Sequence, residues 1–214
     1  LFIAGMTDHH GLLSLLWCGA LYTILSDRTV KAQMALGLIL GLMLWISPEG
    51  LMLWIIVYGA MAIDVFYHPS SIRQAVPVSL IAALTVTAGL LVEQPVQDIF
   101  TNPPMYDTLS LPYVVLAWVI AIASLALSYL FKRVKKFNRR HIFTAAVAAA
   151  ASLGLMWFLF PKIFKGPLVD ADPFIFSDFM PSVSEVIPLF SREKLEIFSL
   201  IFMPQMAGFF LWRA

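Results

Sequence analysis

Seven apolar stretches divide the 214-residue sequence, and they constrain its fold more than any other feature. Crossing the hydrocarbon core of a membrane takes about 20 mostly apolar residues, with a range of roughly 17–25. The first two stretches are the shortest, but their continuity and lack of charge favour membrane spans over buried helices. The sequence therefore predicts an all-α polytopic membrane protein with about seven transmembrane helices. The stretches cover residues 11–25, 32–46, 51–66, 76–92, 111–131, 142–160 and 197–212.

Composition agrees with this class. The chain is 60% hydrophobic and 13% charged, whereas a soluble domain is about half apolar and a quarter charged. Its one cysteine, Cys18, lies inside an apolar stretch, which excludes an internal disulfide and a CxxC metal site. The net charge of +1 gives no indication of a nucleic-acid partner, and we expect none. We expect residues 1–214 to form a single transmembrane domain that is a fragment of a longer protein.

Charge is divided between the two sets of connecting segments. When the seven stretches cross the membrane alternately, one side collects ten of the fourteen Lys and Arg residues and the other collects eleven of the thirteen acids. An excess of Lys and Arg marks the cytoplasmic side. The acidic side, which holds two long loops at 93–110 and 161–196, is therefore predicted to be non-cytoplasmic. Its acids are Asp8, Glu49, Glu93, Asp98, Asp107, Asp170, Asp172, Asp178, Glu185, Glu193 and Glu196.

The string TDHHG places Asp8, His9 and His10 directly before the first apolar stretch. One interpretation is helix capping, because Asp and Thr are preferred N-caps and a carboxylate suits the positive end of a helix dipole. The other interpretation is a metal site, because Asp and His two residues apart can converge on one divalent cation.

A second candidate lies in the loop 161–196, where Glu185 follows the sequence Ser-Val-Ser. The segment Ser182–Glu185 has the S-x-x-E form of a capping box, so helix capping is again the simpler interpretation of this string alone.

Together the two strings resemble the catalytic subunit of oligosaccharyltransferase, a member of the C-type (GT-C) membrane glycosyltransferases. An Asp-x-His motif at a membrane helix, about six spans and a loop carrying Ser-Val-Ser-Glu occur here in the order found in that family. The resemblance covers the whole chain, as roughly the fourth to tenth membrane spans of the family.

The resemblance implies a role for each residue. Asp8 and His10 match metal ligands, Glu185 matches the loop glutamate that reaches the metal and the acceptor, and His9 matches a position without a direct role. Asp8 and Glu185 would be the catalytic residues, and the cation would be Mg²⁺ or Mn²⁺. The donor would be a polyprenyl-linked sugar, with protein asparagine as one candidate acceptor. The loop 161–196 would act as a mobile clamp.

Three alternatives stay open. In the first, the chain is a glycosyltransferase of the same class, but its acceptor is a lipid, a polysaccharide or another glycan in place of protein asparagine. A transporter is a second alternative, although transporters place binding residues near the middle of the bilayer. The third is a scaffold without catalytic activity, in which Asp8 and Glu185 only cap helices. For the enzyme we expect a bacterial or archaeal plasma membrane, and the charge pattern predicts that the active site faces outside.

Two further motifs predict local structure. Gly37 and Gly41 form a GxxxG motif, which is typical of close helix packing in membranes. Pro48 and Gly50 flank Glu49 and predict a tight turn, so we expect this acid to have a structural role.

The remaining polar features are interpreted from their positions. Asp64 lies near the predicted cytoplasmic end of a span, where we expect it to reach the interface or to pair with a nearby base. Tyr106 and Asp107 follow two prolines and predict an ordered turn. The six basic residues within 132–140 are either a topology determinant or a site for anionic headgroups.

Overall fold

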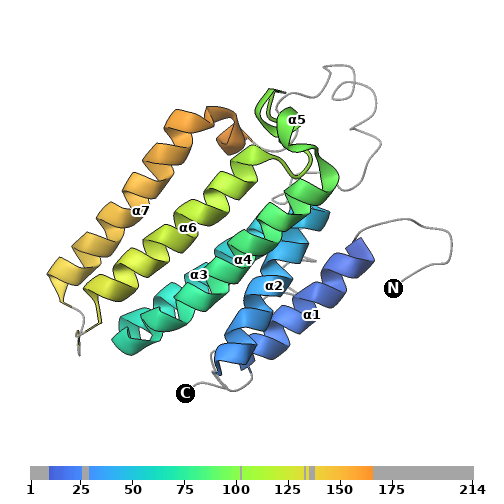
Figure 1. The fold of residues 1–214 in the computed structure, drawn as a ribbon. Helices are drawn as coiled ribbons and strands as arrows, with labels where there is room; N and C mark the ends of the chain where they lie inside the picture. Colours follow the sequence, from blue (N-terminus) through green and yellow to red (C-terminus); the bar gives the residue numbers. More distant parts are fainter. Residues whose placement is uncertain (1–9, 26–28, 102, 133, 135–137, 166–214) are drawn as a thin grey trace, which may run out of the picture. The chain divides into compact units, whose positions relative to one another are not determined.

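The computed structural model describes residues 10–25, 29–101, 103–132, 134 and 138–165. These residues belong to one compact unit that ends at Asp170, and their regular structure is entirely helical (Figure 1). The elements are α1 (His10–Leu25), α2 (Val30–Ile46), α3 (Gly50–Tyr67), η1 (Pro69–Ser71), α4 (Ile72–Glu93), α5 (Val96–Thr101), α6 (Leu111–Leu130), α7 (Arg139–Leu159) and η2 (Pro161–Lys165).

Six of the seven predicted apolar stretches form long helices in the structure: α1, α2, α3, α4, α6 and α7. The helices α3, α6 and α7, and α4 together with η1, are long and apolar enough to cross a membrane. The helices α1 and α2 are shorter apolar helices. The structure is therefore that of an α-helical integral membrane protein. The seventh stretch, 197–212, lies outside the described residues.

The long helices run alternately up and down (Figure 1), and the most extensive contacts are those of α4 with α2 and with α6. In the order of contact they are α1, α2, α4, α6 and α7, and α3 packs against α2 and α4. Leu40, Trp54, Val78, Val86 and Tyr113 are buried between them. By contrast α7 exposes most of its apolar side chains, and only 6% of its candidate span is buried. Such a surface is compatible with contact to lipid.

The contact between α2 and α4 depends on glycine. A Cβ atom at Gly41 would lie 2.5 Å from the Cβ atom of Thr85, and one at Gly37 would overlap the carbonyl oxygen of Val78. Only a residue without a side chain permits this approach of two backbones. The close packing predicted from the GxxxG motif is confirmed.

Polar groups inside the helical unit are mostly paired. The indole nitrogen of Trp54 donates a hydrogen bond to the carbonyl oxygen of Leu40 at 2.9 Å, and that of Trp118 donates to the hydroxyl of Thr87 at 3.0 Å. The hydroxyls of Thr85 and Ser79 donate to carbonyl oxygens of their own helix. A buried donor without a partner would destabilise the fold, and these bonds satisfy the donors. The two tryptophan bonds also link α3 to α2 and α6 to α4.

Two helices begin three or four residues earlier than the apolar stretches predict. The helix α7 begins at Arg139 rather than 142, because the Asn138 side chain accepts a hydrogen bond from the backbone of His141 and completes a capping box. The helix α4 begins at Ile72 rather than 76 and continues directly from η1, which starts at Pro69. Polar and proline residues therefore extend both helices beyond their apolar runs.

The long segment 93–110 contains a helix that the sequence analysis did not predict. Helix α5 (Val96–Thr101) begins after Pro95, and its first bonds run from the amides of Asp98 and Ile99 to the Pro95 carbonyl. Ile99 is buried and anchors the short helix on the core.

Candidate functional site

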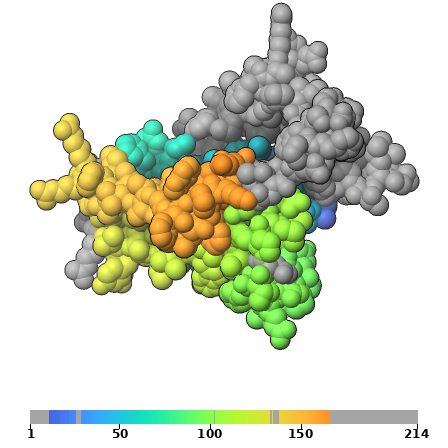
Figure 2. All heavy atoms as spheres, turned by 90° about the horizontal axis from the view of Figure 1, so that it is seen from above, coloured from blue at the N-terminus to red at the C-terminus, as the bar shows by residue number. Residues whose placement is uncertain are grey.

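The alternation of the helices divides the described charged residues between two ends. We call one the acidic end, which carries Glu49, Glu93, Asp98 and Asp107. It comprises the start of α1, the turn between α2 and α3, the segment from the end of α4 to the start of α6, and the end of α7 with η2 (Figure 1). Figure 2 shows the end of α7 and η2 (orange) next to the segment between α4 and α6 (green). The opposite end we call the basic end. It carries Lys31, Arg73, Lys132, Arg139 and Arg140.

Of the predicted metal and catalytic residues, only His10 lies among the described residues. Asp8, His9 and Glu185 lie outside the described residues. His10 is the first residue of α1 and therefore lies at the acidic end. In the described part of the chain, no three His, Cys, Asp or Glu side chains gather closely enough to hold a metal ion. The metal site expected from Asp8, His10 and Glu185 stays a prediction.

The turn between α2 and α3 is built around Ser47. Its carbonyl oxygen accepts a hydrogen bond from the amide of Gly50 at 2.9 Å, and its hydroxyl accepts one from the amide of Glu49 at 3.3 Å. A Cβ atom at Gly50 would lie 2.8 Å from the backbone of Met43. The tight turn predicted from Pro48 and Gly50 is confirmed, and it holds the Glu49 side chain exposed at the acidic end.

The segment before α6 is an ordered turn, as its sequence predicts. The Tyr113 hydroxyl donates a hydrogen bond to the carbonyl oxygen of Tyr106, and the Ser110 hydroxyl donates to that of Met105. Tyr106 and Leu109 are buried, whereas Asp107 between them is exposed. The turn therefore presents one carboxylate outward from a backbone that is fixed on the start of α6.

A contact between α2 and α4 was missed by the sequence analysis. The indole nitrogen of Trp45 donates a 2.7 Å hydrogen bond to a carboxylate oxygen of Glu93. The Trp45 ring lies against Gly89, where a Cβ atom would approach it to 2.7 Å. Gly89 and Glu93 lie four residues apart on α4, so one helix face supplies both the space and the acceptor. The spacing of Gly89 and Glu93 could be seen in the sequence, but it does not identify Trp45 on α2 as their partner.

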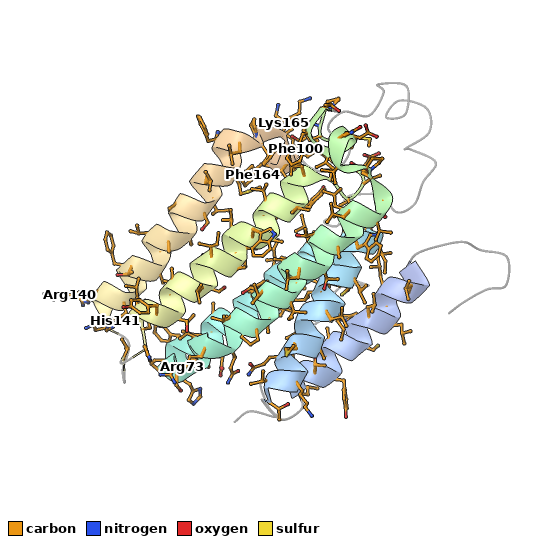
Figure 3. All side chains as sticks on the ribbon, in the orientation of Figure 1. Arg73, Phe100, Arg140, His141, Phe164 and Lys165 are labelled. Atoms are coloured by element: carbon orange, nitrogen blue, oxygen red, sulfur yellow. The ribbon has the colours of Figure 1, made fainter. Side chains whose placement is uncertain are left out.

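Aromatic and basic side chains lie together where α7 ends. Phe164 on η2 contacts Trp157 of α7, with ring centroids 5.3 Å apart, and Ile163 packs against the core. Lys162 and Lys165 on the same short helix are exposed among the acids of this end. Figure 3 shows Phe164 and Lys165 at the same end as Phe100 of α5. The acidic end therefore combines separate carboxylates with exposed aromatic side chains.

No protein-family model matches the chain, and neither a curated protein nor a solved structure matches it. The fold and its two charged ends therefore define the class, an α-helical integral membrane protein, without assigning a family.

Proposed function

We propose that the chain is part of a polytopic membrane glycosyltransferase of the C-type (GT-C) class, similar to the catalytic subunit of oligosaccharyltransferase. It transfers a sugar or oligosaccharide from a polyprenyl phosphate or diphosphate donor to an acceptor at the non-cytoplasmic face. In this proposal the chain crosses the membrane seven times, through the six long helices and the segment 197–212.

The observation that carries the proposal is the position of the first and the last described residues, which border the segments with the predicted site residues. His10 begins α1 and Lys165 ends η2, and both lie at the acidic end. Asp8 lies two residues before His10, and the segment with Glu185 begins directly after Lys165. The helix order therefore supports a site in which residues separated by 177 positions in the sequence, from Asp8 to Glu185, act at one face of the membrane.

The charge distribution supports the sidedness. Lys and Arg gather at the basic end, which in bacterial and archaeal plasma membranes is the cytoplasmic side. The acidic end and the proposed site then face outward.

In the proposed site, Asp8, His10 and Glu185 would hold Mg²⁺ or Mn²⁺. When bound there, the cation would neutralise charge on the departing phosphate or diphosphate. Transfer breaks the bond between the anomeric carbon and the phosphate oxygen, which leaves with the bonding electrons. The acceptor forms the new bond to that carbon and releases its proton to solvent water, and Asp8 or Glu185 hydrogen-bonds the acceptor group.

A transporter fits the described helices less well. Transporters commonly use broken helices and free polar groups near the middle of the bilayer. Here α4 is continuous through Pro77, and the hydroxyls of Ser79, Thr85 and Thr87 are bonded to carbonyl oxygens of their own helix. A lipid or polysaccharide acceptor in place of protein asparagine stays open within the proposed class.

The test is glycan release from a labelled lipid-linked donor in membranes that contain the full-length protein, with and without Mn²⁺. Asp8→Ala and Glu185→Ala are expected to abolish metal-dependent release at normal expression. Asp98→Ala is the matched control, because Asp98 is an exposed carboxylate at the same end that has no proposed role. Wild-type release from the Asp8 and Glu185 variants would contradict the proposal and favour helix caps.

A further inference from the structure

We propose that the basic end is a binding surface for the phosphate headgroups of anionic phospholipids. The inference rests on the described helices and is independent of the proposed catalytic activity. Figure 3 shows Arg73, Arg140 and His141 at this end of the helices.

The first observation is an excess of positive charge with little compensation. Lys31, Arg73, Lys132, Arg139 and Arg140 are all exposed here. Among the described residues, Asp64 is the one carboxylate at this end. Its side chain is 11% exposed, and a carboxylate oxygen lies 3.3 Å from Nδ1 of His68. The predicted pairing of Asp64 with a nearby base is thus confirmed, and among the described residues this end carries one little-exposed carboxylate and five exposed cations.

The second observation is where the cations lie on their helices. Lys31, Arg73, Arg139 and Arg140 each occupy the first turn of α2, α4 or α7. The helix dipole disfavours a cation at this position and favours an anion. A bound phosphate would compensate the side-chain charge and the positive helix end together. Three helices with the same unfavourable arrangement at one end point to an anionic ligand outside the protein.

The third observation is that the cationic side chains belong to packed elements. A guanidinium nitrogen of Arg73 donates a 2.9 Å hydrogen bond to the carbonyl oxygen of Lys132. The rings of Phe131 and His141 meet edge to face with centroids 5.4 Å apart. These contacts join the ends of α4, α6 and α7. A guanidinium has five N–H donors, so Arg73 keeps others for a ligand.

The fourth observation identifies the ligand as a lipid. Tyr22, Tyr67 and Tyr129 lie in or next to the last turns of α1, α3 and α6, and they are 71–79% exposed. Exposed tyrosines at helix ends are typical of the headgroup level of a membrane. The basic residues begin or follow the helices at this same end, within reach of lipid phosphates. Anionic lipids attract such residues in the cytoplasmic leaflet.

The test is a lipid titration of the purified full-length protein in a nonionic detergent, with bound lipids counted by native mass spectrometry. Phosphatidylglycerol is compared with phosphatidylcholine and with inorganic phosphate. The test variant is R139Q/R140Q. The matched control is K162Q/K165Q, which removes the same charge at the acidic end. The charge-conserving variant R139K/R140K separates charge from side-chain shape.

We expect R139Q/R140Q to weaken phosphatidylglycerol binding by at least about tenfold, as two surface charges warrant. The R139K/R140K and K162Q/K165Q variants should stay within about twofold of the wild type. Equal binding of phosphatidylglycerol and phosphatidylcholine would overturn the proposal, as would full phosphatidylglycerol binding by R139Q/R140Q. Displacement of the lipid by equimolar inorganic phosphate would instead show a free-phosphate site and would also overturn it.

Discussion

Trp45 and Glu93 join α2 to α4 at the acidic end through a hydrogen bond of 2.7 Å between the indole nitrogen and a carboxylate oxygen. The bond lies on the same side of α4 as Gly89, over which the indole ring packs. The pair therefore closes the end of a helix contact whose deeper part is formed by Gly37 and Gly41.

A double-mutant cycle measures this bond. Trp45→Phe removes the donor, and Glu93→Gln removes the charge of the acceptor. We expect a coupling energy of about 1 kcal/mol for unfolding in mixed detergent micelles. Strictly additive effects of the two changes would show that the bond contributes nothing.

The glycine contact between α2 and α4 predicts that one added methyl group lowers the free energy of unfolding at Gly41 but not at Gly59. Gly41→Ala places a Cβ atom against Thr85, so we expect a loss of about 1–3 kcal/mol in the free energy of unfolding. Gly59→Ala is the matched control, because nothing lies within 4 Å of a Cβ atom there. Alanine is the better helix former, so the control should be neutral or stabilising. Equal losses in both variants would be inconsistent with this packing.

Tyr113→Phe tests the ordered turn before α6. The change leaves the buried carbonyl of Tyr106 without its hydroxyl donor, at an expected cost of about 1–3 kcal/mol. Hydrogen exchange of the amides in 105–110 should accelerate. Tyr129→Phe, at an exposed position on the same helix, should leave that exchange unchanged. Protection that persists in Tyr113→Phe would mean that other contacts hold the turn.

The proposed metal site predicts different effects for substitutions at two adjacent histidines. His10→Ala is expected to raise the Mn²⁺ concentration needed for half-maximal glycan release by at least about tenfold, because a ligand is lost. His9→Ala should leave that concentration unchanged. A chelator should abolish release in the wild type, and Mn²⁺ should restore it. The same metal requirement in both variants would exclude the Asp-x-His ligand pair.

Part of the fold could be predicted because single features determine it. Six of the seven apolar stretches correspond to the six long helices, since a chain in a membrane must satisfy its backbone hydrogen bonds within each span. Gly37 and Gly41 indicated a close contact because their spacing places both on one helix face. The turns at Ser47 and Tyr106 followed from proline and glycine chemistry.

Other features depend on partners that are distant in the sequence. Helix α5 is anchored by Ile99 on a core formed by other helices, so its own six residues carry little signal. The bonds from Trp45 to Glu93 and from Arg73 to Lys132 join residues 48 and 59 positions apart. Neither pairing follows from spacing along one helix.

The sequence by itself determined the class of protein, the helices and the separation of acidic from basic connections, because hydrophobicity and charge act residue by residue against the membrane. Only the tertiary structure decided which helices are neighbours and which side chains meet. It paired α2 with α4 through glycine, and it joined the ends of α4, α6 and α7 through the bond from Arg73 to Lys132 and the ring contact of Phe131 with His141. Those relationships depend on packing between distant segments, and packing is settled by shape when the helices come together.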